Sequence, residues 1–152
     1  MNKIKTLKTY ECRIDNYFND GAELSENIIA ISPSKARYQF YINRESDGGY
    51  KEWFKSIKVR SLGAMKPRDI FGDIEEFNQM KERRGIGFAY QGMVIDVSGR
   101  KGWIVGNNSS LNLDVLFEGE TYASNCHPTW ETTYYDNKMN IVKDFKKNNT
   151  SN

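Results

Sequence analysis

The chain has 152 residues, of which 38% are hydrophobic, 13% aromatic and 28% charged, and its formal net charge is +2. This length suits one domain or two small interdependent ones, and the chain holds too many large apolar groups to be disordered. Interspersed charges of both signs argue against a broad basic surface for duplex nucleic acid. No run approaches the roughly 20 apolar residues that cross a bilayer, so the sequence predicts a cytoplasmic protein without a membrane partner.

The first part of the chain, residues 1–62, predicts a small sheet with one helix. Apolar and polar residues alternate in residues 8–18, which is typical of a strand with one solvated face, and residues 27–31 predict a second strand. A third strand is expected over residues 57–62. Such a β-β-α-β unit has a thin core, so we expect an anchor that docks on another surface.

A helix is predicted over residues 34–44. Ser32 supplies an N-cap, and Pro33 occupies the first helical position, where its fixed φ and missing N–H are tolerated. Arg37 and Tyr41 are four residues apart and are therefore neighbours on the helix surface.

Residues 63–90 predict a linker followed by a second helix. Asp73 is an N-cap candidate with Glu76 three residues later, which resembles a capping box. Arg83 and Arg84 fall in the last turn, where the helix dipole favours positive charge. We prefer this capping role for the two arginines to a phosphate site.

Residues 91–145 predict a C-terminal antiparallel β-core, because short apolar runs alternate with Gly, Asn and Asp. The predicted strands are residues 93–97, 102–107, 111–117, 129–135 and 139–145. Residues 146–152 form a polar tail. The expected fold class is α+β, with a small N-terminal sheet and its helix, then a helix and a β-barrel or sandwich.

Chemical motifs of catalysis are missing from the sequence. His127 is the only histidine, and no nucleophile motif is placed near it. Cys12 and Cys126 lie in opposite halves and indicate neither a metal site nor a disulfide framework. The sequence therefore predicts a protein that is not an enzyme and needs no cofactor or metal.

A nucleotide site is predicted from a cluster of polar and aromatic residues in the β-core. Trp103 offers a stacking surface for a base, Asn107, Asn108 and Asn112 can read its edge, and Asp114 can hold ribose hydroxyls. Each residue also has a structural interpretation. Trp103 could belong to the core, Asn107 and Asn108 could shape a turn, and Asp114 could be solvated.

Phosphate groups need cationic donors, and no arginine follows Arg100. The candidates are therefore those of the first half, namely Arg13, Arg37, Arg44 and Arg60. A pocket that combines Arg37 with the β-core would form between the two halves or between two chains. We therefore expect a ligand site at an interface and at least a homodimer.

Four stretches, residues 31–38, 102–108, 112–117 and 127–130, resemble small phage-encoded proteins of the anti-Thoeris sponge family. The resemblance implies an N-terminal sheet-and-helix anchor and a C-terminal β-core. It also implies binding of a cyclic nucleotide, glycocyclic ADP-ribose, which a TIR-domain enzyme of the bacterial Thoeris defence makes. Such proteins hold the signal uncleaved at a homodimer interface; some assemble into hexamers, and some sequester cyclic oligonucleotides.

By this resemblance Arg37 would contact the diphosphate, Trp103 would stack on a base and Asn112 would bind the ligand. The family's pocket is expected to contain a late arginine that this chain lacks, so His127, Thr129 or Lys138 would replace it. The candidate ligand-binding residues are Arg37, Tyr41, Trp103, Asn107, Asn108, Asn112, Asp114, His127 and Thr129. The alternative function is an SH3-like barrel module that binds nucleic acid or a host protein.

Overall fold

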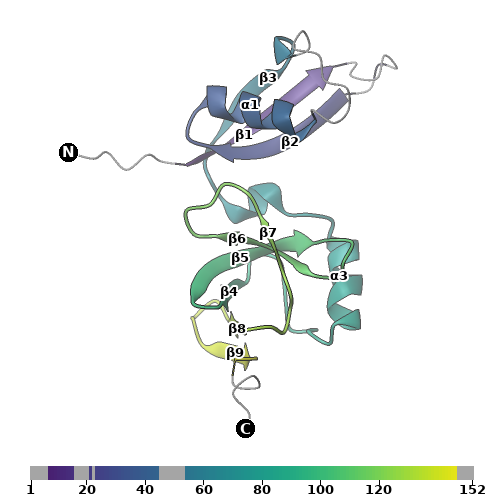
Figure 1. Ribbon diagram of the computed structural model, residues 1–152, viewed down its shortest axis with the longest axis vertical. Coiled ribbons are helices and arrows are strands. Elements are labelled where there is room, and N and C mark those ends of the chain that lie inside the picture. Colours follow the sequence, from purple (N-terminus) through teal and green to yellow (C-terminus); the bar gives the residue numbers. More distant parts are fainter. Residues whose placement is uncertain (1–6, 16–20, 22, 45–53, 147–152) are drawn as a thin grey trace, which may run out of the picture. The chain divides into compact units, whose positions relative to one another are not determined.

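The computed structural model divides the chain into two compact units, Met1–Asp69 and Ile70–Asn152, here called the first and second units (Figure 1). The described residues are 7–15, 21, 23–44 and 54–146. Both units contain helices and antiparallel sheets, and the second has the larger sheet. The predicted α+β class with a sheet-rich C-terminal core is confirmed.

The first unit is a three-stranded antiparallel sheet with helix α1, Pro33–Asn43, on one face (Figure 1). Its strands are β1 (Lys8–Asp15), β2 (Glu23–Ala30) and β3 (Lys58–Ala64), in the order β2-β1-β3. Ser32 caps α1, because its hydroxyl accepts from the Lys35 amide at 3.2 Å. Phe40 of α1 and Cys12 of β1 are fully buried in the resulting core.

The segment predicted as a linker begins as part of the first unit. A 3-10 helix, η2 (Pro67–Ile70), places Asp69 against the sheet, where its carboxylate accepts from the Thr9 hydroxyl at 3.0 Å. The Asn27 side chain donates to the Asp69 carbonyl oxygen at 2.7 Å. These two bonds tie residues 67–69 to β1 and β2.

The second unit contains α3 (Ile74–Arg83) and a six-stranded antiparallel sheet. The strands are β4 (Val94–Val97), β5 (Arg100–Asn107), β6 (Leu113–Phe117), β7 (Ser124–Cys126), β8 (Thr132–Tyr135) and β9 (Ile141–Asp144). Their order is β7-β6-β5-β4-β8-β9, so β4 to β7 form a meander and β8 returns to pair with β4. Asp73 caps α3 by accepting from the Glu76 amide at 2.9 Å.

The core of the second unit joins α3 to the inner face of the sheet. Phe77 and Met80, one turn apart on α3, are fully buried in one cluster with Ile104 and Leu113. Leu111 was expected to begin the third strand of the meander, but β6 begins at Leu113 and Leu111 has a φ of 59° in the preceding loop. The strand is shorter because the chain turns tightly there.

Both cysteines are free and buried, and burial raises the pKa of Cys12 to about 11 and also raises that of Cys126. Each thiol should therefore stay protonated and unreactive at pH 8 in the folded protein. We expect a disulfide reagent such as DTNB to label neither thiol within minutes and both in urea. Rapid labelling of the native protein would contradict this burial.

Candidate functional site

The loop between β5 and β6, residues 108–112, is held in one conformation by its own hydrogen bonds. The Asn108 side chain makes two of them: Oδ1 accepts from the Ser110 amide at 3.0 Å, and Nδ2 donates to Asp114 Oδ1 at 2.9 Å. The Leu111 amide donates to the Asn108 carbonyl oxygen at 3.0 Å, and Leu111 adopts a left-handed conformation. The loop therefore presents its polar groups in fixed directions.

A groove of about 480 Å³ lies between α3 and this loop. Its helix side consists of Glu76, Gln79, Met80 and Arg83. Its other side consists of Asn107, Asn108, Ser109 and Leu111. Positions 76, 80 and 83 recur at helical spacing, so one face of α3 forms the wall. The volume is within the roughly 300–1,000 Å³ of small-molecule sites.

Arg84, the residue that follows α3, fixes the far end of the loop. Its Nε donates to the Leu111 carbonyl oxygen at 2.7 Å, and its Nη2 donates to the Ser110 carbonyl oxygen at 3.2 Å and to Asn112 Oδ1 at 2.9 Å. Its Nη1 lies 3.3 Å from His127 Nε2. The guanidinium thus brings together Asn112 and His127, two of the predicted site residues.

His127 is oriented by the residues that follow it. Its Nδ1 accepts from the Thr129 amide at 3.1 Å and lies 3.2 Å from the Thr129 hydroxyl. The Pro128 carbonyl oxygen is anchored in the core, because Tyr134 donates to it at 2.6 Å and Thr132 donates at 3.0 Å. The imidazole of His127 is exposed, but the backbone that follows it is held by these hydrogen bonds.

Five of the seven predicted residues of the β-core fall into two groups, and Asp114 accepts from Asn108. Asn107 and Asn108 line the groove, whereas Asn112 and His127 lie next to the Arg84 guanidinium and Thr129 binds His127. Both ends of the Asn108 amide are hydrogen-bonded within the chain, as a residue that shapes the turn would be.

Trp103 is half-buried in β5, opposite Val94 of β4 and Leu116 of β6. It is not among the residues that line the groove. Trp130, which is not among the predicted site residues, is 57% exposed and follows Thr129, so it offers a second stacking surface. Its position directly after the turn at 127–129 was the available signal.

Arg37 and Tyr41 lie in the first unit. Arg37 Nε donates to the Ile57 carbonyl oxygen at 3.4 Å, and the ring of Tyr41 makes an edge contact with Phe54 at 5.4 Å between centroids. Both side chains therefore contribute to the packing of α1 against its neighbours.

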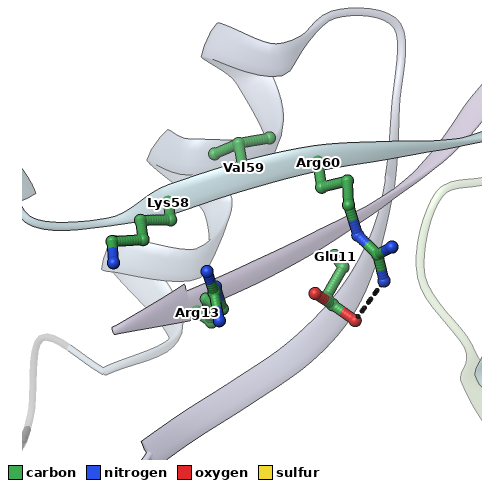
Figure 2. Close-up of a pocket in the computed structure, with 5 residues that line it drawn as sticks. All are labelled: Glu11, Arg13, Lys58, Val59 and Arg60. Carbon is green, nitrogen blue, oxygen red and sulfur yellow. Dashed lines mark hydrogen bonds and ion pairs between the residues drawn. The ribbon is translucent and has the colours of Figure 1, made fainter. Parts of the chain in front are cut away.

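A second pocket, of about 370 Å³, opens on the sheet of the first unit. Figure 2 shows it lined by Glu11, Arg13, Lys58, Val59 and Arg60, with the Arg60 guanidinium turned toward the Glu11 carboxylate. The ion pairs are Arg60–Glu11 at 3.0 Å, Arg13–Glu23 at 3.4 Å and Lys58–Asp15 at 2.8 Å. Each cation already has a carboxylate partner, although only Glu11 of these carboxylates lines the pocket, so a phosphate would have to compete with three exposed ion pairs.

The described residues contain no group of three or more His, Cys, Asp or Glu side chains that could hold a metal ion. Among the same residues, no helix has the length and apolar character that a membrane span requires. No protein-family model, no curated protein and no solved structure matches this chain.

Proposed function

We propose that the second unit binds a nucleotide in the groove between α3 and the β5–β6 loop and holds it without cleaving it. The observation that supports this is that Arg83, Gln79 and Asn107 all line one groove of about 480 Å³. A guanidinium suits phosphate oxygens, and amides suit the hydrogen-bonding edge of a base. The preformed loop reduces the entropy lost on binding.

The ligand class that we propose is the one implied by the resemblance to anti-Thoeris sponges. The protein would sequester glycocyclic ADP-ribose, or cyclic oligonucleotides, in an infected bacterial host and would act as a homo-oligomer. Each of these ligands carries at least two phosphate groups. A site for them therefore needs more than one cationic donor. Light scattering of the purified protein measures the oligomeric state.

The test is recovery of the ligand. Purified protein is mixed with glycocyclic ADP-ribose, binding is measured by calorimetry, and the mixture is then heated to denature the protein. Release of the intact molecule, identified by mass spectrometry, supports sequestration. A hydrolysed product would indicate an enzyme, and the absence of binding would reject this ligand.

Replacing Arg83 with Ala should weaken nucleotide binding about tenfold or more, because a hydrogen bond to a charged group contributes about 1.5–3 kcal/mol. Arg83 is exposed, so the fold should tolerate the change. Arg68→Ala, in which another exposed arginine is removed, is the matched control and should bind within twofold of wild type. Equal affinities of the Arg83 variant and wild type would place the ligand elsewhere.

The alternative, an SH3-like binding module, is favoured by the strand order of the second unit. A four-strand meander whose first strand also pairs with a later strand is compatible with such barrels. Tyr122 and Trp130 are 66% and 57% exposed and could stack on a single-stranded nucleic acid. Salt-sensitive gel shifts with RNA or DNA, without any stabilisation by nucleotides, would favour this alternative.

A further inference from the structure

We infer that Arg84 and His127 form a subsite for a phosphate oxygen, which rests on the proposed function and adds a second cationic donor to the nucleotide site. The subsite shares the β5–β6 loop with the groove, because Leu111 lines the groove and its carbonyl oxygen binds Arg84. Three features support it: the tautomer of His127, the lack of an ion-pair partner for Arg84 among the described residues, and the hydrogen bonds that hold both side chains in place.

The tautomer of His127 is set by the backbone. An amide N–H can only donate, so the Thr129 amide, 3.1 Å from Nδ1, requires a lone pair on Nδ1. The ring proton of the neutral imidazole is then on Nε2. His127 Nε2 and Arg84 Nη1 are 3.3 Å apart. Both are then hydrogen-bond donors, and neither can accept from the other.

An acceptor between these two donors would satisfy both. A phosphate oxygen has several lone pairs and negative charge, and it can accept from Nη1–H and Nε2–H together. Asn112, Ser110 and Leu111 cannot supply this acceptor, because their oxygens are engaged with Nη2 and Nε on the other side of the guanidinium.

Among the described residues, no carboxylate forms an ion pair with Arg84. In the part of the chain that the structure describes, six ion pairs are present and none includes Arg84. The guanidinium is half-buried and all three of its assigned acceptors are neutral oxygens. A partly desolvated cation without a counter-ion attracts an anion more strongly than the paired arginines of the first unit do.

Both side chains are held in place before any ligand binds. Three hydrogen bonds fix the guanidinium, and the Thr129 amide fixes the imidazole. An anion would therefore meet two oriented donors without the cost of ordering them. This is the geometry of a built subsite rather than of mobile surface charges.

The experiment uses His127 as its own probe, because it is the only histidine and its ring signals need no assignment. Nitrogen-15 correlation spectra of the imidazole report which nitrogen carries the proton. Pyrophosphate, adenosine and ADP are then titrated separately at low salt. We expect a proton on Nε2, saturable shifts with pyrophosphate and ADP, and no shift with adenosine.

The separate titrations with pyrophosphate and ADP distinguish failure of the subsite from failure of the proposed function. If ADP binds by calorimetry but leaves the His127 signals unchanged, the subsite is rejected and the nucleotide function stands. If pyrophosphate shifts His127 but ADP binds no better than pyrophosphate and is insensitive to Arg83→Ala, the subsite stands and the proposed function is rejected. A proton on Nδ1 together with no pyrophosphate shift would overturn the subsite, because Arg84 would then donate to Nε2.

Two variants test the residues directly, with phosphorus-31 NMR of pyrophosphate as the readout. Arg84→Gln and His127→Ala should each weaken pyrophosphate binding about tenfold, because each removes one donor. His127 is exposed, so its variant should fold even if the loop needs Arg84. Arg68→Gln should bind within twofold of wild type, and an equal loss in this control would show that only general charge matters.

Discussion

Replacing Gly102 with Ala should destabilise the second unit by about 2–3 kcal/mol, because added atoms in a closed core displace their neighbours. A Cβ at this position would lie 2.6 Å from the Leu116 carbonyl oxygen, 2.9 Å from the Phe117 Cα and 2.9 Å from Val115 Cγ1. Two of these atoms are backbone, so β6 itself would have to move away from β5. The expected result is a lower urea midpoint with an unchanged slope.

Gly87→Ala is the matched control for this prediction. No atom lies within 4 Å of a Cβ at Gly87, and its φ is not positive, so the change should alter stability by less than about 0.5 kcal/mol. Hydrogen exchange of the Ile104 amide, which donates to the Met93 carbonyl oxygen, assigns the loss to the second unit. A Gly102→Ala protein as stable as wild type would show that β5 and β6 are less tightly packed than these distances indicate.

The features that the sequence predicted best depend on neighbours along the chain. The caps of α1 and α3 were predicted because Ser32 and Asp73 bind amides only three residues later. The alternation of Leu113, Val115 and Phe117 predicted their burial on one face, since a strand has a period of two.

The environment of Arg84 could not be predicted in this way. Its side-chain contacts lie 26 to 43 positions later in the chain, and they depend on where α3 packs against the sheet. A residue in the last turn of a helix has a sufficient local role as a cap, so the sequence gives no reason to look further. The arginines of the first half have no such local role, yet Arg13, Arg44 and Arg60 are paired with carboxylates.

Asn108 and Leu111 show the same limit for loops. The side-chain amide of Asn108 is suited both to binding a ligand and to stabilising a turn. Its hydrogen bond to Asp114 across the turn, which indicates the second role, is visible only in the structure. Leu111 fits the strand pattern by its apolar side chain, but the loop places it at a positive φ. Residue type alone distinguishes neither case.

Replacing Tyr134 with Ala should destabilise the second unit by about 3–5 kcal/mol, the cost of removing a large buried ring. Tyr134 is fully buried and packs edge-on against Phe88 at 5.0 Å and Phe145 at 6.0 Å. Burial also raises the pKa of its hydroxyl, which therefore stays protonated and continues to donate to Pro128. Urea denaturation measures the loss, and Tyr135→Phe, at a half-buried neighbour, should cost less than about 0.5 kcal/mol.

Tyr134→Phe separates the ring from the hydroxyl. It keeps the aromatic packing and should cost only about 1 kcal/mol, because the Pro128 carbonyl oxygen retains its hydrogen bond from Thr132. Since Pro128 follows His127, losing one of the two hydrogen bonds to the Pro128 carbonyl oxygen should shift or broaden the His127 ring signals in NMR spectra. If Tyr134→Phe costs as much as Tyr134→Ala, the hydroxyl rather than the ring holds this part of the core, and unchanged His127 signals would mean that Thr132 alone positions the segment.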